Sequence, residues 1–118
     1  MDREELRQRT KRFALSVVQF TGSVSKSYQA QVMARQLLRA GVSVGANYRA
    51  ALRAKSVADY ISKMGTVEEE TDECLYWLEL LGEGKIVSEK QTEPLRLEAD
   101  QLLAIFVASI KTAKGRLR

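Results

Sequence analysis

Residues 39–56 read RAGVSVGANYRAALRAKS, a stretch with small residues at helical spacing that includes Gly41 and Gly45 one turn apart. Glycine inside a helix costs about 0.5–1 kcal/mol relative to alanine, so two glycines on one face need a structural reason. Close approach of a second helix supplies that reason, because a side chain at either position would hold the two backbones apart. The stretch therefore predicts a helix that packs tightly on one side and presents its arginines on another side.

Four segments, one of them containing this stretch, space their apolar residues three and four apart, as α-helices do. The predicted core positions run from Leu6 to Val24, from Ala34 to Ala51, from Val57 to Leu81 and from Leu95 to Leu117. Steps of three and four are typical of left-handed helix bundles. The sequence therefore predicts one all-α domain over residues 1–118, an antiparallel up-down-up-down four-helix bundle.

Serine, glycine and proline mark the predicted ends of these helices. The first break falls in residues 22–26, and Ser56 and Ser88 are predicted N-caps. Because Ser56 follows the second helix so closely, we expect almost no linker between the second and third helices. Gly84 is expected to end the third helix, since glycine tolerates the left-handed conformation of a C-cap. Pro94 is expected near the first turn of the fourth helix, where its missing N–H is harmless.

The residue types that carry most enzyme chemistry are scarce in this chain. There is no histidine and a single cysteine, Cys74, so a transition-metal site or a histidine-dependent triad is not expected. The acidic residues 68–70 point to different sides of a helix and do not converge on one ion. No glycine-rich phosphate loop is visible. The sequence predicts a non-enzymatic protein with no catalytic residues, no metal and no cofactor.

The apolar runs and the lone cysteine indicate where the protein resides. The first twelve residues are charged and lack the apolar region of a secretory signal. The longest apolar runs, such as residues 102–110, are far shorter than the roughly 20 residues of a membrane span. One cysteine cannot form an internal disulfide, which fits a reducing compartment. We therefore expect a cytoplasmic protein that does not contact a membrane.

The third predicted helix is apolar beyond its core positions. It reads CLYWLELL over residues 74–81, which leaves Tyr76, Trp77 and Leu80 outside the core row. A helix that is apolar around most of its circumference is usually buried around most of it. Isolated apolar residues on a surface are common, but three together favour a contact. We predict that they lie between the subunits of a homo-oligomer.

The net charge of +4 is unevenly distributed. Residues 1–55 carry eleven basic and three acidic side chains, whereas residues 56–84 carry one basic and eight acidic. One interpretation is charge complementarity within and between subunits, and the other is a basic surface for a polyanion. The preferred candidates for binding nucleic acid lie at the end of the second helix and in its turn: Arg49, Arg53 and Lys55. The next candidates lie on the first helix: Arg3, Arg7 and Lys11.

Arg39 is expected to have a structural role instead. It lies within the small-residue stretch, where close packing leaves little room for a ligand. Glu68 falls on the apolar flank of Ile61 and Leu75, so its carboxylate is expected to be half-buried and to need a partner. Arg35 and Arg39 are the natural candidates, and the predicted ion pair joins Arg39 to Glu68.

Three blocks of sequence together resemble a known family: residues 39–56, ADYISKM at 58–64 and ECLYWLELL at 73–81. They resemble the four-helix-bundle proteins called 23S rRNA intervening-sequence proteins and, more distantly, the accessory proteins of diversity-generating retroelements. The resemblance covers nearly the whole chain and implies a ring-like homo-oligomer, expected to be a homopentamer, with a role involving nucleic acid. The chain departs from the family pattern at residues 50–51, where glutamate is frequent, and at Gly65, where alanine is frequent.

The sequence supports two hypotheses of function. The first is a non-enzymatic, oligomeric adaptor that binds nucleic acid, with RNA favoured, through basic helix faces. The alternative is a homo-oligomeric scaffold for protein interactions, with a reverse transcriptase as one partner, whose basic groups are solvated or pair with a neighbouring subunit. A salt titration of binding to structured RNA and duplex DNA separates them, because phosphate contacts give a steep salt dependence.

Overall fold

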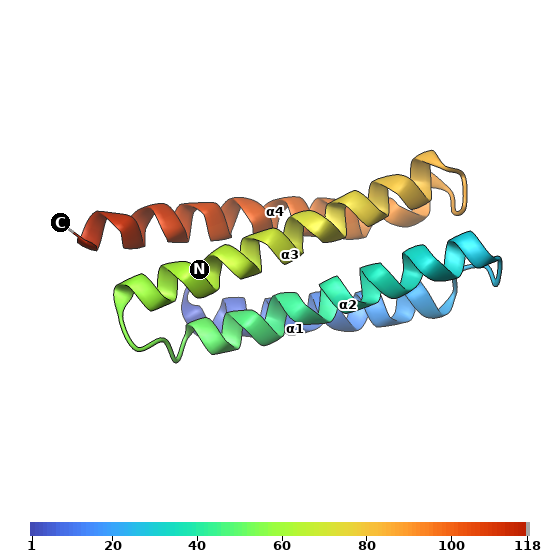
Figure 1. Ribbon diagram of the computed structural model, residues 1–118. Helices are drawn as coiled ribbons and strands as arrows, with labels where there is room; N and C mark the ends of the chain where they lie inside the picture. Colours follow the sequence, from blue (N-terminus) through green and yellow to red (C-terminus); the bar gives the residue numbers. More distant parts are fainter. Residues whose placement is uncertain (118) are drawn as a thin grey trace.

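The computed structural model describes residues 1–117, which form four long antiparallel helices (Figure 1). They are α1 (Arg3–Gly22), α2 (Tyr28–Ala51), α3 (Val57–Glu83) and α4 (Glu89–Lys114), and a short 3-10 helix, η1 (Gly115–Leu117), follows. Each helix packs against the next along the chain, and α4 returns to α1, in a body of 50 × 21 × 19 Å. The described residues contain no strand, and the prediction of an all-α four-helix fold is confirmed.

Each long helix begins at a side chain that caps its first turn. Asp2, Ser27, Ser56 and Ser88 each accept a hydrogen bond from the backbone N–H three residues further on. At α4 the capping is reciprocal, because the Gln91 side chain accepts from the Ser88 N–H at 2.9 Å. Such caps contribute about 1 kcal/mol each. The N-caps predicted at Ser56 and Ser88 are confirmed.

The α2–α3 connection is longer than expected. The last residue of α2 is Ala51 and the first of α3 is Val57, so residues 52–56 form a connection of their own. Its first half tightens into turns, in which the Arg53 N–H donates to the carbonyl of the residue three positions earlier at 3.1 Å. Arg53 and Lys55 therefore lie in this connection and not on a helix. Pro94 also differs slightly from expectation, since it lies in the second turn of α4.

The helix α3 ends at Gly84 as predicted, but this glycine does not adopt the predicted left-handed conformation. Gly84 has a φ of −76°, and the residue with positive φ is Lys85, at 60°. The N–H groups of Lys85 and Ile86 donate to the carbonyls of Gly82 and Leu81, at 3.1 and 3.0 Å, which is the Schellman arrangement. Gly84 is required for space instead, because a Cβ there would stand 2.7 Å from a carbonyl oxygen of the preceding turn.

The contact between α1 and α2 is tight. A Cβ on Gly41 would stand 2.8 Å from Val17 Cγ1, a distance that real Cβ atoms essentially never show, and one on Gly45 would lie 3.4 Å from Thr10 Oγ1. Val17 and Thr10 are themselves fully buried. The predicted close approach at the two glycines is therefore confirmed, and α1 is the helix that approaches.

The contact between α1 and α4 is of a different kind, because these two helices are the least closely packed of the neighbouring pairs. Arg9 bridges them: its Nε and Nη2 donate to the two carboxylate oxygens of Glu98 at 2.7 Å each, and Nη2 also donates to Gln101 Oε1 at 2.7 Å. Beside this bridge lies an open groove of about 580 Å³ whose lining includes Phe13 and Leu95. Hydrogen bonds from a charged side chain are thus a main part of the contact between α1 and α4.

Candidate nucleic-acid interface

The topology gathers positive charge at one end of the bundle. The start of α1, the α2–α3 connection and the end of α4 lie at the same end (Figure 1). These segments, residues 1–11, 49–63 and 107–117, carry eleven basic and four acidic side chains and are called the basic end below. At the opposite end, residues 20–35 and 79–98 carry five basic and five acidic side chains. The positive charge of the protein is therefore concentrated at the basic end.

Two carboxylates of the basic end, those of Asp2 and Asp59, are already hydrogen-bonded within it. Asp2 caps α1, and its hydrogen bond from the Glu5 N–H lowers the pKa of its carboxyl. Asp59 accepts from Lys63 Nζ at 2.7 Å and from the Lys55 N–H at 3.0 Å, and these bonds lower the pKa of Asp59. Within residues 1–117 no ion pair involves the side chains of eight of the eleven basic residues at this end: Arg3, Lys11, Arg49, Arg53, Lys55, Lys111, Lys114 and Arg116.

The predicted nucleic-acid-binding residues fall into two groups. Arg3 and Lys55 line one cavity together, while Arg49 and Arg53 are exposed beside it, on the last turn of α2 and in the connection. Arg7 is engaged on the surface, where its Nη1 lies 3.0 Å from Glu4 Oε1. Lys11 is exposed, and it lies about 12 Å from Arg3 along α1, because a helix rises 1.5 Å per residue. Arg118, another basic residue, lies outside the described residues.

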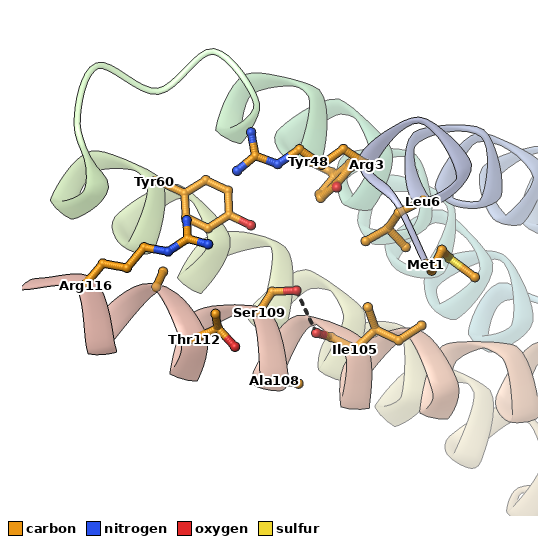
Figure 2. Close-up of a pocket in the computed structure, with 11 residues that line it drawn as sticks. Met1, Arg3, Leu6, Tyr48, Tyr60, Ile105, Ala108, Ser109, Thr112 and Arg116 are labelled. Carbon is orange, nitrogen blue, oxygen red and sulfur yellow. Dashed lines mark hydrogen bonds between the residues drawn. The ribbon is translucent and has the colours of Figure 1, made fainter.

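Two cavities meet at the basic end, and both are lined by Arg3, Tyr60 and Arg116. Figure 2 shows the residues that line the first of them. The first has a volume of about 280 Å³ and the second about 200 Å³. The Arg3 guanidinium carbon lies 5.5 Å from the centre of the Tyr60 ring, a cation–π contact. Among residues 1–117, no carboxylate lines either cavity. The arrangement provides cationic hydrogen-bond donors around an aromatic ring.

Tyr48 lines the larger cavity from its inner side. The residue is 2% exposed, and its ring lies 6.0 Å, centre to centre, from that of Phe106 in the core. Burial raises the pKa of Tyr48 to about 12. Its phenol therefore stays neutral at physiological pH and adds no negative charge to the wall of the cavity.

Sequence reasoning did not identify these cavities. Tyr48 and Tyr60 fall within the predicted core rows, and Arg116 is not among the predicted site residues. A signal was available, because tyrosine at a core position near a helix end usually places its hydroxyl toward water. What the sequence does not reveal is that residues 3, 60 and 116 converge.

The predicted ion pair between Arg39 and Glu68 is wrong. Arg39 instead pairs with Glu70, at 3.2 Å between Nη1 and Oε2, and with Glu73 through Nη2. With 3.6 residues per turn, Glu68 falls on the same flank of α3 as Gly82, and a Cβ on Gly82 would contact Thr92 of α4. Glu70 and Glu73 occupy the other flank, which faces α2. The hydrogen bond from Arg39 lowers the pKa of Glu73.

The three predicted interface residues differ in exposure. Tyr76 is 54% exposed, whereas Trp77 and Leu80 are half-buried. The Trp77 indole N–H donates to Glu73 Oε1 at 3.2 Å, and its ring meets that of Tyr76 edge-on at 5.2 Å between centres. An aromatic pair with one exposed member is thus held in a fixed orientation on the outside of α3.

Two further properties bear on function. Cys74 is buried, and burial raises the pKa of its thiol to about 12, so it has little of the thiolate that a nucleophile needs. None of the helices in residues 1–117 combines the length and apolar content that crossing a bilayer requires.

Comparison with known proteins agrees with this fold. The 23S rRNA-intervening sequence protein family matches residues 3–108. A crystal structure of a protein of unknown function from the S23 ribosomal protein family of Bacteroides thetaiotaomicron VPI-5482 is similar, with 31% identity and a TM-score of 0.86 over 94% of this chain and 99% of that one. No curated protein matches the chain. The expected resemblance is confirmed: the chain belongs to the 23S rRNA-intervening sequence protein family.

Proposed function

We propose that this protein is a non-enzymatic adaptor that binds nucleic acid, with RNA as the preferred target, and that it acts as a homo-oligomer. The observation that carries the proposal is the basic end, where eight of the eleven cationic side chains have no ion-pair partner within residues 1–117. The family name supports RNA as the target, because it refers to a segment of ribosomal RNA.

The arrangement of charge suits a phosphate backbone. Arginine binds phosphate through two parallel hydrogen bonds, and a guanidinium that is not already paired is available to do so. Two acidic residues of α3, Glu70 and Glu73, do not compete with a phosphate, because they are paired with Arg39. In a homo-oligomer the basic ends of several subunits would add their fields.

Binding of fluorescent structured RNA and duplex DNA, measured by anisotropy over a range of salt concentrations, tests the proposal. We expect Arg49→Ala/Arg53→Ala to weaken binding and to reduce the slope of log K against log salt on duplex DNA by about 1.8, since each lost phosphate contact removes about 0.9. The matched control is Lys26→Ala/Lys90→Ala, which removes the same charge from exposed positions at the opposite end. Equal losses in the two double variants would reject the basic end as the binding surface.

A second candidate function, a homo-oligomeric scaffold for protein partners such as a reverse transcriptase, is favoured by the exposed aromatic pair on α3. A tyrosine that is 54% exposed beside a half-buried tryptophan is a typical interface anchor. Light scattering of the parent and of Tyr76→Ala tests this. We expect the parent to be an oligomer and the variant to have a higher dissociation constant, so that on dilution it becomes monomeric at a higher protein concentration. A parent that is monomeric at micromolar concentration would reject the scaffold. If the parent also fails to bind nucleic acid at low salt, the scaffold becomes the better account.

A further inference from the structure

We propose that the larger cavity at the basic end binds one unstacked nucleotide of a single-stranded nucleic acid, with its base against Tyr60 and its phosphate on Arg3 and Arg116. This inference rests on the proposed nucleic-acid function and names the ligand class that the site selects.

The first support is the aromatic surface inside the cavity. Tyr60 is half-buried, and one face of its ring already carries the flat guanidinium of Arg3 at 5.5 Å. A nucleobase is also flat and stacks on aromatic rings and on guanidinium planes. Because arginine has a long flexible side chain, Arg3 can leave the ring for a phosphate when a base takes its place.

The second support is the charge around this ring. Arg3 comes from α1 and Arg116 from η1, so two helical segments that are distant in sequence bring a guanidinium to the same tyrosine (Figure 2). Both line the cavity, and no carboxylate of the described part of the chain does. The neutral hydroxyl of Tyr48 lies on the same wall and can both donate and accept a hydrogen bond at a base edge.

The third support is size. The cavity volume of about 280 Å³ lies just below the usual range of roughly 300–1,000 Å³ for small-molecule sites, which restricts the ligand to a single nucleotide at most and excludes a stacked pair. A base inside a duplex cannot reach such a cavity without leaving its stack, which costs energy. The site therefore favours single strands, loops and ends over continuous duplex.

Anisotropy with a labelled oligouridylate and with an RNA duplex of the same length tests this inference. We expect the parent to prefer the single strand, and Tyr60→Leu to weaken single-strand binding by about 5- to 150-fold, the usual loss when one stacking contact is removed, while duplex binding is unchanged. The matched control is Tyr28→Leu, which removes a tyrosine that is 78% exposed at the opposite end, and we expect it to change neither affinity. A second variant, Ala108→Leu, narrows the cavity from an exposed position; if Tyr60→Leu does not fold, Ala108→Leu must show the same selective loss.

The results separate this inference from the function on which it rests. If the parent binds both probes equally and Tyr60→Leu and Ala108→Leu leave single-strand binding intact, the nucleotide site is wrong and the basic end remains a backbone-binding surface. If the parent binds neither probe at low salt, both proposals are wrong. Loss of single-strand binding alone, in the variants that change the cavity, supports the site.

Discussion

Helix α1 contacts its two neighbours in opposite ways. Against α2 it lies so close that a Cβ on Gly41 would collide with Val17. Against α4 it packs loosely, and a charged bridge from Arg9 to Glu98 spans the gap. The first contact depends on the absence of side-chain atoms and the second on the presence of two charged groups. One helix of a bundle can thus be held by close packing on one side and by an ion pair on the other.

The two contacts should therefore respond to different substitutions. Added volume should damage the α1–α2 contact, because neither backbone can move away without opening the core. Loss of charge should damage the α1–α4 contact, because the partner carboxylate would be left partly buried. Two substitutions test this distinction, and a third, at a helix glycine with no close neighbour, is the comparison for added volume; they follow in order of decreasing effect.

The largest effect is expected for Gly41→Leu. The new side chain would meet Val17 at less than contact distance, so we expect a net destabilisation of about 1–3 kcal/mol even though leucine favours a helix more than glycine does. Urea unfolding followed by circular dichroism measures the change. A variant as stable as the parent would show that α1 can move away, and the close contact would not be a constraint.

A smaller effect is expected for Arg9→Met, which keeps the apolar stem and removes the charge. The Arg9 and Glu98 side chains are only 16% and 29% exposed, so the orphaned carboxylate should lower stability by about 1–2 kcal/mol. The control is Arg7→Met, whose ion pair with Glu4 is exposed, and which should change stability by about 0.5 kcal/mol or less. Equal unfolding free energies for the two variants would mean that the bridge to α4 contributes no more than a surface pair.

The smallest effect is expected for Gly65→Ala, and it has the opposite sign. Nothing lies within 4 Å of a Cβ at Gly65, so alanine should improve the helix without a clash and stabilise the protein by about 0.5–1 kcal/mol. Thermal unfolding measures it beside Gly41→Leu. Should Gly65→Ala lower the melting temperature, this glycine faces a contact that the single chain does not contain.

The sequence predicts features within one helix well and contacts between segments distant in sequence poorly. Four helices, the caps at Ser56 and Ser88 and the glycine contact on α2 all follow from residues within a few turns of one another. The partners of Arg39 did not follow, because they depend on which flank of α3 faces α2. The convergence on Tyr60 depends on the path of the whole chain, since Arg3 and Arg116 stand at its two extremes. The left-handed conformation of Lys85 was missed for another reason. Glycine is the common residue at that position of a helix end, so the left-handed conformation was predicted at Gly84, one residue too early.

The order of the helices has a consequence for how the protein reaches this state. The three closely packed pairs, α1–α2, α2–α3 and α3–α4, each join helices that follow one another in the chain. Contacts between near sequence neighbours give a low contact order, and helical proteins of that kind fold in about microseconds to milliseconds. Among the contacts between the four long helices, the α1–α4 contact closes the longest loop, and loop closure carries an entropic penalty. We therefore expect the three sequential helix pairs to form early and the Arg9–Glu98 bridge to form last, after the two helices that it joins are already in place.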